Sequence, residues 1–114
     1  MQYRGSCHCG KVRIEFEGNV DSAVSCNCSI CSKRGSLLWF TARDAVKITG
    51  EDELTTYTFN KHVIKHRFCR TCGILTHGEG KDPQGNLGAA INLRCLDDFD
   101  FTKVPVHHYD GKSA

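Results

Sequence analysis

Seven of the eight cysteines fall into three short motifs whose spacing is that of metal-ligating thiols. The densest motif, Cys26–Cys31, has the sequence CNCSIC and places three thiols within six residues. Cys26 and Cys28 point to the same side of an extended chain, and Cys31 can join them after a turn. Structural zinc sites use four protein ligands, whereas catalytic ones use three and keep an open position. We therefore predict an open, catalytic zinc site at these three cysteines, with the fourth position left for a substrate thiol or water.

The other two motifs predict a second zinc site that is closed. Cys7–Gly10 has the sequence CHCG, and Cys69–Gly73 is a CxxCG turn that can bind one ion from two thiols. Other pairings of the seven thiols are conceivable, but this one leaves the three-cysteine motif whole. Joining such distant segments removes much chain entropy, so the closed site should matter for stability. The expected structural ligands are Cys7, Cys9, Cys69 and Cys72.

Composition supports metal binding over disulfides. Eight cysteines would suit a secreted disulfide framework, but the start at Met1–Gly5 has no apolar signal segment. No run is long enough to span a membrane. We therefore expect a cytoplasmic protein in which reduced thiols hold two zinc ions per chain. Its formal charge of +2 becomes near neutral once seven thiolates bind two zinc ions, so we expect no nucleic-acid partner.

The elements that position these motifs are β-strands. The 114 residues suffice for one domain, residues 1–114. Its hydrophobic core should be small, so bound metal ions would help to stabilise it. Residues 11–17 alternate polar and apolar types and predict a strand with Val12, Ile14 and Phe16 inward. No amphipathic helix of ordinary length is present, so we predict an all-β fold. Further strands are predicted at residues 37–40, 46–48, 54–59, 63–68 and 89–93.

Three connecting segments carry weaker predictions. Residues 32–36 form a polar loop in which Lys33 and Arg34 either meet an anionic substrate or are simply solvated, and we favour solvation. Residues 78–88 predict a glycine-rich mobile surface loop in preference to a lid. Residues 97–114 predict a C-terminal segment anchored by aromatic side chains.

The remaining thiol and the histidines have no ligand spacing. Cys95 is expected to pack as a small apolar core residue. The histidines are expected on the surface or in hydrogen bonds rather than at a metal. His77 is the candidate proton carrier among them, because it follows the CxxCG motif closely. The histidines in question are His62, His66, His77, His107 and His108.

The three cysteine motifs, at residues 7–10, 26–31 and 68–73, resemble those of the glutathione-dependent formaldehyde-activating enzymes. Residues 57–62 and 92–97 resemble the branch of that family that includes centromere protein V. The resemblance runs in unbroken order from Gly5 through Leu96. It implies a small zinc-stapled fold of several coiled β-sheets, of the Mss4-like type, with the structural and catalytic ligands assigned as above.

The resemblance also implies a reaction. In the family, glutathione and formaldehyde give S-hydroxymethylglutathione, and members are grouped as carbon–sulfur lyases. We therefore expect a zinc-dependent enzyme acting on a small thiol and an aldehyde. The chain is shorter than the formaldehyde-activating type, so a glutathione pocket built from an extended C-terminal part should be missing. The alternative is a non-catalytic zinc-binding module whose second zinc is closed by Cys95 or a histidine.

Overall fold

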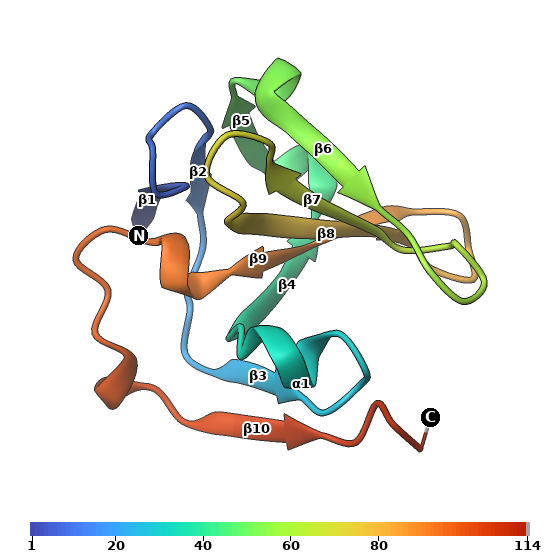
Figure 1. Ribbon diagram of the computed structural model, residues 1–114. Helices are drawn as coiled ribbons and strands as arrows, with labels where there is room; N and C mark the ends of the chain where they lie inside the picture. Colours follow the sequence, from blue (N-terminus) through green and yellow to red (C-terminus); the bar gives the residue numbers. More distant parts are fainter. Residues whose placement is uncertain (114) are drawn as a thin grey trace.

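The computed structural model describes residues 1–113 and confirms an all-β fold of small coiled sheets (Figure 1). Ten strands and one short helix, α1 (Cys31–Arg34), form the regular structure of the described residues, with short 3₁₀ turns between them. In this part of the chain, no helix has the length and apolar character needed to cross a membrane. The strands are β1 (Gln2–Ser6), β2 (Arg13–Glu17), β3 (Ala23–Cys26), β4 (Leu38–Ala42), β5 (Val46–Thr49), β6 (Leu54–Tyr57), β7 (Lys65–Cys69), β8 (Leu75–Lys81), β9 (Leu87–Asn92) and β10 (Val106–Tyr109).

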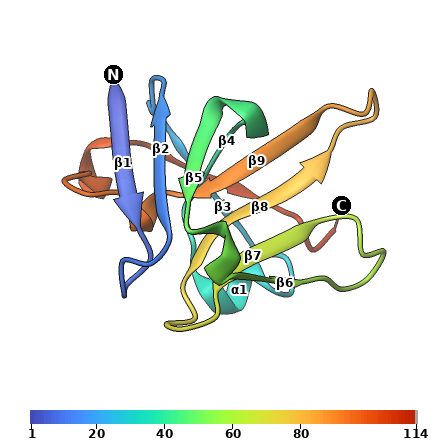
Figure 2. The same ribbon diagram turned by 90° about the horizontal axis from the view of Figure 1, so that it is seen from above.

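The strands form two sheets that share one core. β1, β2 and β5 form a three-stranded antiparallel sheet, and the other strands form a sheet in the order β10-β3-β4-β9-β8-β7-β6. Figure 1 shows β10 and β3 side by side at one end of the larger sheet and β6 at the other, and Figure 2 shows β1, β2 and β5 next to one another in the small sheet. The inward residues of β2, Ile14 and Phe16, are buried as predicted, and Val12 just before the strand is fully buried. Ile14 and Phe16, together with Ile91 of β9 and Leu93 just after it, belong to the main core between the sheets.

Two predictions about connections were wrong. Residues 32–36 are not a polar loop, because Cys31–Arg34 forms the single helical turn α1, which ends at Gly35 with a φ of 69°. Residues 78–88 are not a mobile loop either, since Gly78–Lys81 belong to β8 and pair with β9. Only residues 82–86 make the connection. Glycine has no side chain to contribute to an alternating apolar pattern, so the sequence did not predict this part of the strand. Backbone hydrogen bonds to β9 stabilise it nonetheless.

The C-terminal segment, expected at residues 97–114, contributes a strand that was not predicted. β10 pairs in parallel with β3, so that Val106 lies opposite Ala23 and Tyr109 opposite Cys26. Phe99 and Phe101 pack against the core, as their proposed anchoring role requires. Residue 114 lies outside the described residues.

Gly5 permits a close crossing of chain segments, and its replacement provides a test of the fold. Gly5 bridges to Leu96, and a Cβ at Gly5 would overlap the backbone carbonyl of Cys95. We expect Gly5→Ala to lower the free energy of unfolding by about 3 kcal/mol, because two backbones would have to separate.

Gly85→Ala is the matched control. Gly85 has a φ of 86° but no heavy atom near its added Cβ, so its replacement should cost only about 1 kcal/mol of backbone strain. Denaturant unfolding followed by circular dichroism measures both values. Equal losses in the two variants would contradict the close crossing at Gly5.

Candidate metal centres and the adjoining cavity

Four cysteines from two hairpins meet at one point, as the sequence predicted. Cys7 and Cys9 follow β1, whereas Cys69 ends β7 and Cys72 lies in the turn before β8. The sulfur of Cys9 lies 3.6 Å from that of Cys7 and 3.6 Å from that of Cys69. All four sulfur atoms lie within 4.8 Å of one another. The group joins the small sheet to the large one and can hold a metal ion.

The surroundings of these thiols fit a cation. Burial raises the pKa of Cys72, but hydrogen bonds from the backbone N–H groups of Cys9 and Ile74 and contacts with two thiols lower it to about 6. A backbone hydrogen bond from Lys11 lowers the pKa of Cys9, but burial and the neighbouring thiols outweigh it and raise that pKa to about 11. Four such thiols ionise together only beside a positive ion, and thiolates are the form that binds metal.

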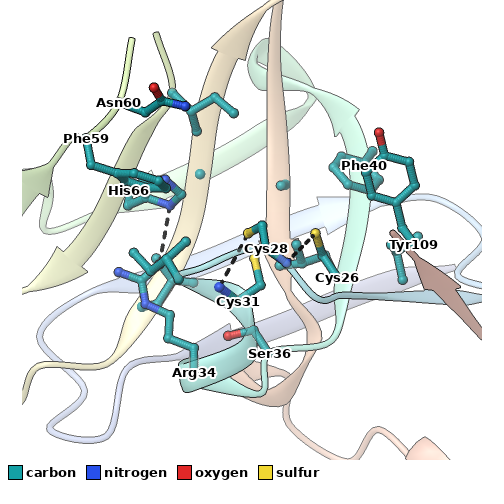
Figure 3. A pocket seen from close by; sticks show the side chains of 17 residues that line it. Cys26, Cys28, Cys31, Arg34, Ser36, Phe40, Phe59, Asn60, His66 and Tyr109 are labelled. Carbon is teal, nitrogen blue, oxygen red and sulfur yellow. Dashed lines mark hydrogen bonds between the residues drawn. The ribbon is translucent and has the colours of Figure 1, made fainter. Parts of the chain in front are cut away.

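The second cysteine group contains Cys26, Cys28 and Cys31. Their sulfur atoms lie within 4.8 Å of one another, and no fourth cysteine, histidine or carboxylate joins them in the described chain. Backbone N–H groups shape the cluster locally, because Cys28 donates to the sulfur of Cys26 at 3.4 Å and Cys31 to that of Cys28 at 3.5 Å. These are the dashed contacts at the centre of Figure 3. The group can hold a metal ion through three thiolates.

The electrostatics of this group also fit a cation. Burial, followed by the hydrogen bond and charge of Cys28 and by the charge of Cys26, raises the pKa of the Cys31 thiol to about 12. A positive ion among the three sulfur atoms would reverse that shift, because each thiolate would then face opposite charge. The donor set is therefore one that a thiophilic metal ion suits.

The C-terminal segment braces the three-cysteine group, which the sequence had not suggested. Asn27 lies between two of the cysteines, and its backbone N–H donates to the carbonyl of Tyr109 at 3.2 Å. Its side-chain amide donates to Asp110 at 2.9 Å and accepts from the backbone N–H of Lys112 at 2.9 Å. Gly111 lies directly against the sulfur of Cys26. Three bonds to one asparagine therefore fix the residue that spaces the ligands.

A cavity of about 540 Å³ opens beside the three cysteines. Its walls come from distant parts of the chain, including β3, β4, α1, the loop after β6, and the strands β7 to β10. Figure 3 shows Phe40 and Tyr109 on one side of the cysteines and Phe59 and His66 on the other. The three predicted catalytic cysteines therefore face a space large enough for a small organic molecule.

Arg34 and His66 form a polar pair on the cavity wall. The guanidinium nitrogen of Arg34 lies 3.3 Å from Nδ1 of His66. Arginine has no acceptor, so it must donate and Nδ1 must accept, which leaves the proton of the neutral ring on Nε2. Burial, followed by the charge of Arg34, lowers the pKa of His66 and keeps the ring neutral. The ring stacks on Phe59, with 5.4 Å between centroids.

Sequence reasoning missed both residues of this pair. Arg34 was expected to be solvated, but the helical turn α1 turns it toward the cavity. His66 was treated as one histidine among five. The available signal was its position on a predicted strand leading to Cys69, but the strand pairing that places it opposite α1 is not visible in the sequence.

His77, the predicted proton carrier, is excluded from the cavity. The side chain is fully buried, with Nδ1 2.9 Å from the hydroxyl of Thr76 and Nε2 2.9 Å from the carboxylate of Glu79. Glu79 also accepts from Arg43 at 2.8 Å. His77 alternates with the cavity-lining Gly78 along β8 and so faces the other side of the sheet. It belongs to a buried polar network and has no path to the cysteines.

Cys95 behaves as an apolar core residue, as expected. It is 7% exposed within the main core cluster, and its thiol donates to the carbonyl of Leu75 at 3.3 Å. Burial, followed by the charges of Cys7 and Cys72, raises its pKa to about 12. Cys95 therefore lies near the four-cysteine group and does not complete the three-cysteine group.

Comparison with known proteins identifies the family. The sequence pattern of the glutathione-dependent formaldehyde-activating enzymes matches residues 2–111. A Colletotrichum graminicola protein with a provisional assignment as such an enzyme is 30% identical over a match of 83 residues. The match covers 68% of this chain and 44% of the relative. The chain thus spans less than half the length of that curated relative.

A solved structure has the same fold. The crystal structure of a Rhodobacter sphaeroides protein superposes with a TM-score of 0.77 at 33% sequence identity, and the match covers 91% of this chain and 99% of that one. The family match extends over all three cysteine motifs and over β10, which braces the second of them. The chain therefore belongs to the glutathione-dependent formaldehyde-activating enzyme family.

Proposed function

We propose that this protein is a zinc-dependent carbon–sulfur lyase-type enzyme. It adds a small thiol to an aldehyde such as formaldehyde and catalyses the reverse cleavage. The observation that carries the proposal is the three-cysteine group, which has no fourth ligand in the described chain and opens onto a cavity of about 540 Å³. Three protein ligands with an open position are the arrangement of catalytic zinc. The family match supports the choice of thiol and aldehyde as substrates.

Two zinc ions per chain suit the two cysteine groups. Sulfur atoms at about 2.3 Å from a tetrahedral zinc are separated by about 3.8 Å, and the measured separations around Cys9 are 3.6 Å. Cys7, Cys9, Cys69 and Cys72 would hold the structural ion. Cys26, Cys28 and Cys31 would hold the catalytic one, and zinc there would lower the pKa of a substrate thiol and fix its sulfur in place.

The cavity residues supply the remaining chemistry. In the addition, the sulfur bonds to the carbonyl carbon and the thiol's proton ends on the former carbonyl oxygen; the reverse reaction returns both. His66 offers an N–H at Nε2, because Nδ1 already accepts from Arg34. This N–H can donate a hydrogen bond to the aldehyde oxygen as negative charge develops there. The proton that the thiol releases reaches that oxygen through solvent and returns the same way in the cleavage direction. The apolar walls limit water around the reacting carbon.

Two finer assignments belong to the same proposal. Residues 57–62 and 92–97 resemble the branch that includes centromere protein V, and membership of that branch is part of the proposal. A non-catalytic zinc module is the alternative function there. A closed second site would need another ligand, and Cys95 lies beside the other cysteine group. A cytoplasmic location agrees with eight cysteines that are all free thiols.

Loss of the two ions should have unequal consequences. Cys72→Ser should release one zinc ion and unfold the domain, because its site joins the two sheets. Cys28→Ser should release the other ion but leave a folded protein with a lowered melting temperature. Metal analysis by mass spectrometry and thermal unfolding test both. Purified protein with one zinc or none, and with cysteines paired as disulfides, would refute the scheme.

The open coordination position can be tested with cobalt. In cobalt-substituted protein, adding 2-mercaptoethanol should increase the sulfur-to-cobalt absorption, because a fourth thiolate enters the site. Cys95→Ala should respond in the same way. If the spectrum does not respond to thiol and changes only on substitution of Cys95, the second site is closed by the protein and the binding-module alternative is correct.

The role of His66 can be separated from its packing. His66→Leu should lower kcat/KM for adduct formation about a hundredfold, since loss of one hydrogen-bond donor to a developing oxyanion costs at least that much, while the zinc content stays at two. His62→Leu is the matched control, because the side chain of His62 is exposed on the neighbouring loop and, within residues 1–113, bonds only to Thr58. Equal activity of the two variants would remove His66 from the mechanism.

A further inference from the structure

The cavity beside the three cysteines is apolar over most of its wall. Apart from the thiols, its polar lining side chains are few, namely Arg34, Ser36, Asn60, His66 and the hydroxyl of Tyr109. The rest of the wall is aliphatic or aromatic. Apolar surface binds apolar ligands, and each buried methylene contributes about fourfold to binding. The part of the wall that a ligand would cover is formed chiefly by Val24, Leu38, Phe40, Phe59, Ile64 and Leu75.

One side chain on this wall carries a fixed charge without an acidic partner. Arg34 donates to the neutral ring of His66, and in residues 1–113 it forms no ion pair with Asp or Glu. Burial lowers the pKa of Arg34, and the neighbouring thiols oppose that shift, so the guanidinium stays charged. The guanidinium has further N–H groups, besides the one that donates to His66, that can donate to a carboxylate. The wall can therefore neutralise one anionic group.

Charge matching excludes a peptide-like thiol from the interior. Glutathione carries two carboxylates and one ammonium group, and no Asp or Glu lines the cavity to receive the ammonium. Only Arg34 is available for the two carboxylates. Burying the unmatched charges would cost more than the sulfur contact returns. Glutathione would have to leave most of its groups in solvent at the cavity mouth.

We propose that the preferred thiol of this site is an apolar molecule with a single anionic group, whose chain lies on the aliphatic and aromatic wall and whose carboxylate binds Arg34. This inference rests on the proposed function and specifies its substrate class. Formaldehyde has no side group, so the thiol is the reactant that must fill the cavity. Arg34 is then a specificity-determining residue that binds the substrate.

The test compares thiols that differ in charge and in the length of their apolar chain. Adduct formation with formaldehyde is followed for 6-mercaptohexanoate, the uncharged 6-mercaptohexanol, the shorter 3-mercaptopropionate and glutathione, after subtraction of the spontaneous rate. We expect kcat/KM to be highest for 6-mercaptohexanoate, at least tenfold above each of the other three thiols. Calorimetric titration of the zinc-loaded protein should rank the affinities in the same order.

Substitutions at two neighbouring positions isolate the charge. Arg34→Met should lower kcat/KM for both six-carbon thiols, because His66 loses its hydrogen-bond donor. The loss for 6-mercaptohexanoate should be at least tenfold larger than that for 6-mercaptohexanol, because the carboxylate loses a partner as well. Lys33→Met is the matched control, since Lys33 is exposed on the same turn and does not line the cavity. It should leave both values within about twofold. Arg34→Lys should recover part of the loss.

The outcomes separate this inference from the proposed function. If glutathione reacts as well as 6-mercaptohexanoate, the substrate class is wrong and the lyase activity stands. The same holds if Arg34→Met lowers kcat/KM equally for 6-mercaptohexanoate and 6-mercaptohexanol. If Arg34→Met lowers kcat/KM equally for both six-carbon thiols and also lowers the zinc content, the role of Arg34 is to balance the charge of the metal site. If zinc-loaded protein accelerates adduct formation for none of the four thiols, the proposed function fails as well. The ranking of thiols by the unmodified protein tests the inference even if a variant does not fold.

Discussion

The convergence of four thiols is the constraint on which the rest of this structure depends. Cys7 and Cys9 lie in the hairpin of the small sheet, and Cys69 and Cys72 lie at the hairpin of the large one. The buried cluster around them contains little else, mainly Val12 with Ile48 and Leu54 at its edge. So few apolar contacts contribute little cohesion between the sheets, and a bound ion would supply most of it at this end.

The four-cysteine group also sets the position of the candidate active site. β7 ends at Cys69, so the four-cysteine group fixes one end of the strand that carries His66. On the other side of the cavity, α1 begins at Cys31 and presents Arg34 one turn later. The hydrogen bond between Arg34 and His66 therefore connects segments that the two cysteine groups hold. The two cysteine groups and the polar wall of the cavity are therefore parts of one arrangement.

The three-cysteine group differs from the four-cysteine group in what surrounds it. The first faces a cavity and is braced by Asn27 and the C-terminal strand, whereas the second is packed between hairpins. An ion bonded to three protein ligands can exchange its fourth ligand, but one bonded to four is coordinatively complete. The difference in surroundings thus suits one group for chemistry and the other for stability.

The sequence by itself determined the all-β class, both cysteine groups and the inward face of β2, because alternation and CxC or CxxC spacing are local properties of the chain. Tertiary structure alone decided the rest. Arg34 and His66 are 32 residues apart and meet only through the packing of α1 near β7. Asp110, just after β10, accepts a hydrogen bond from Asn27 across 83 residues. His77 faces away from the cavity because side chains alternate along β8. Such contacts depend on strand order and register, which no local spacing encodes.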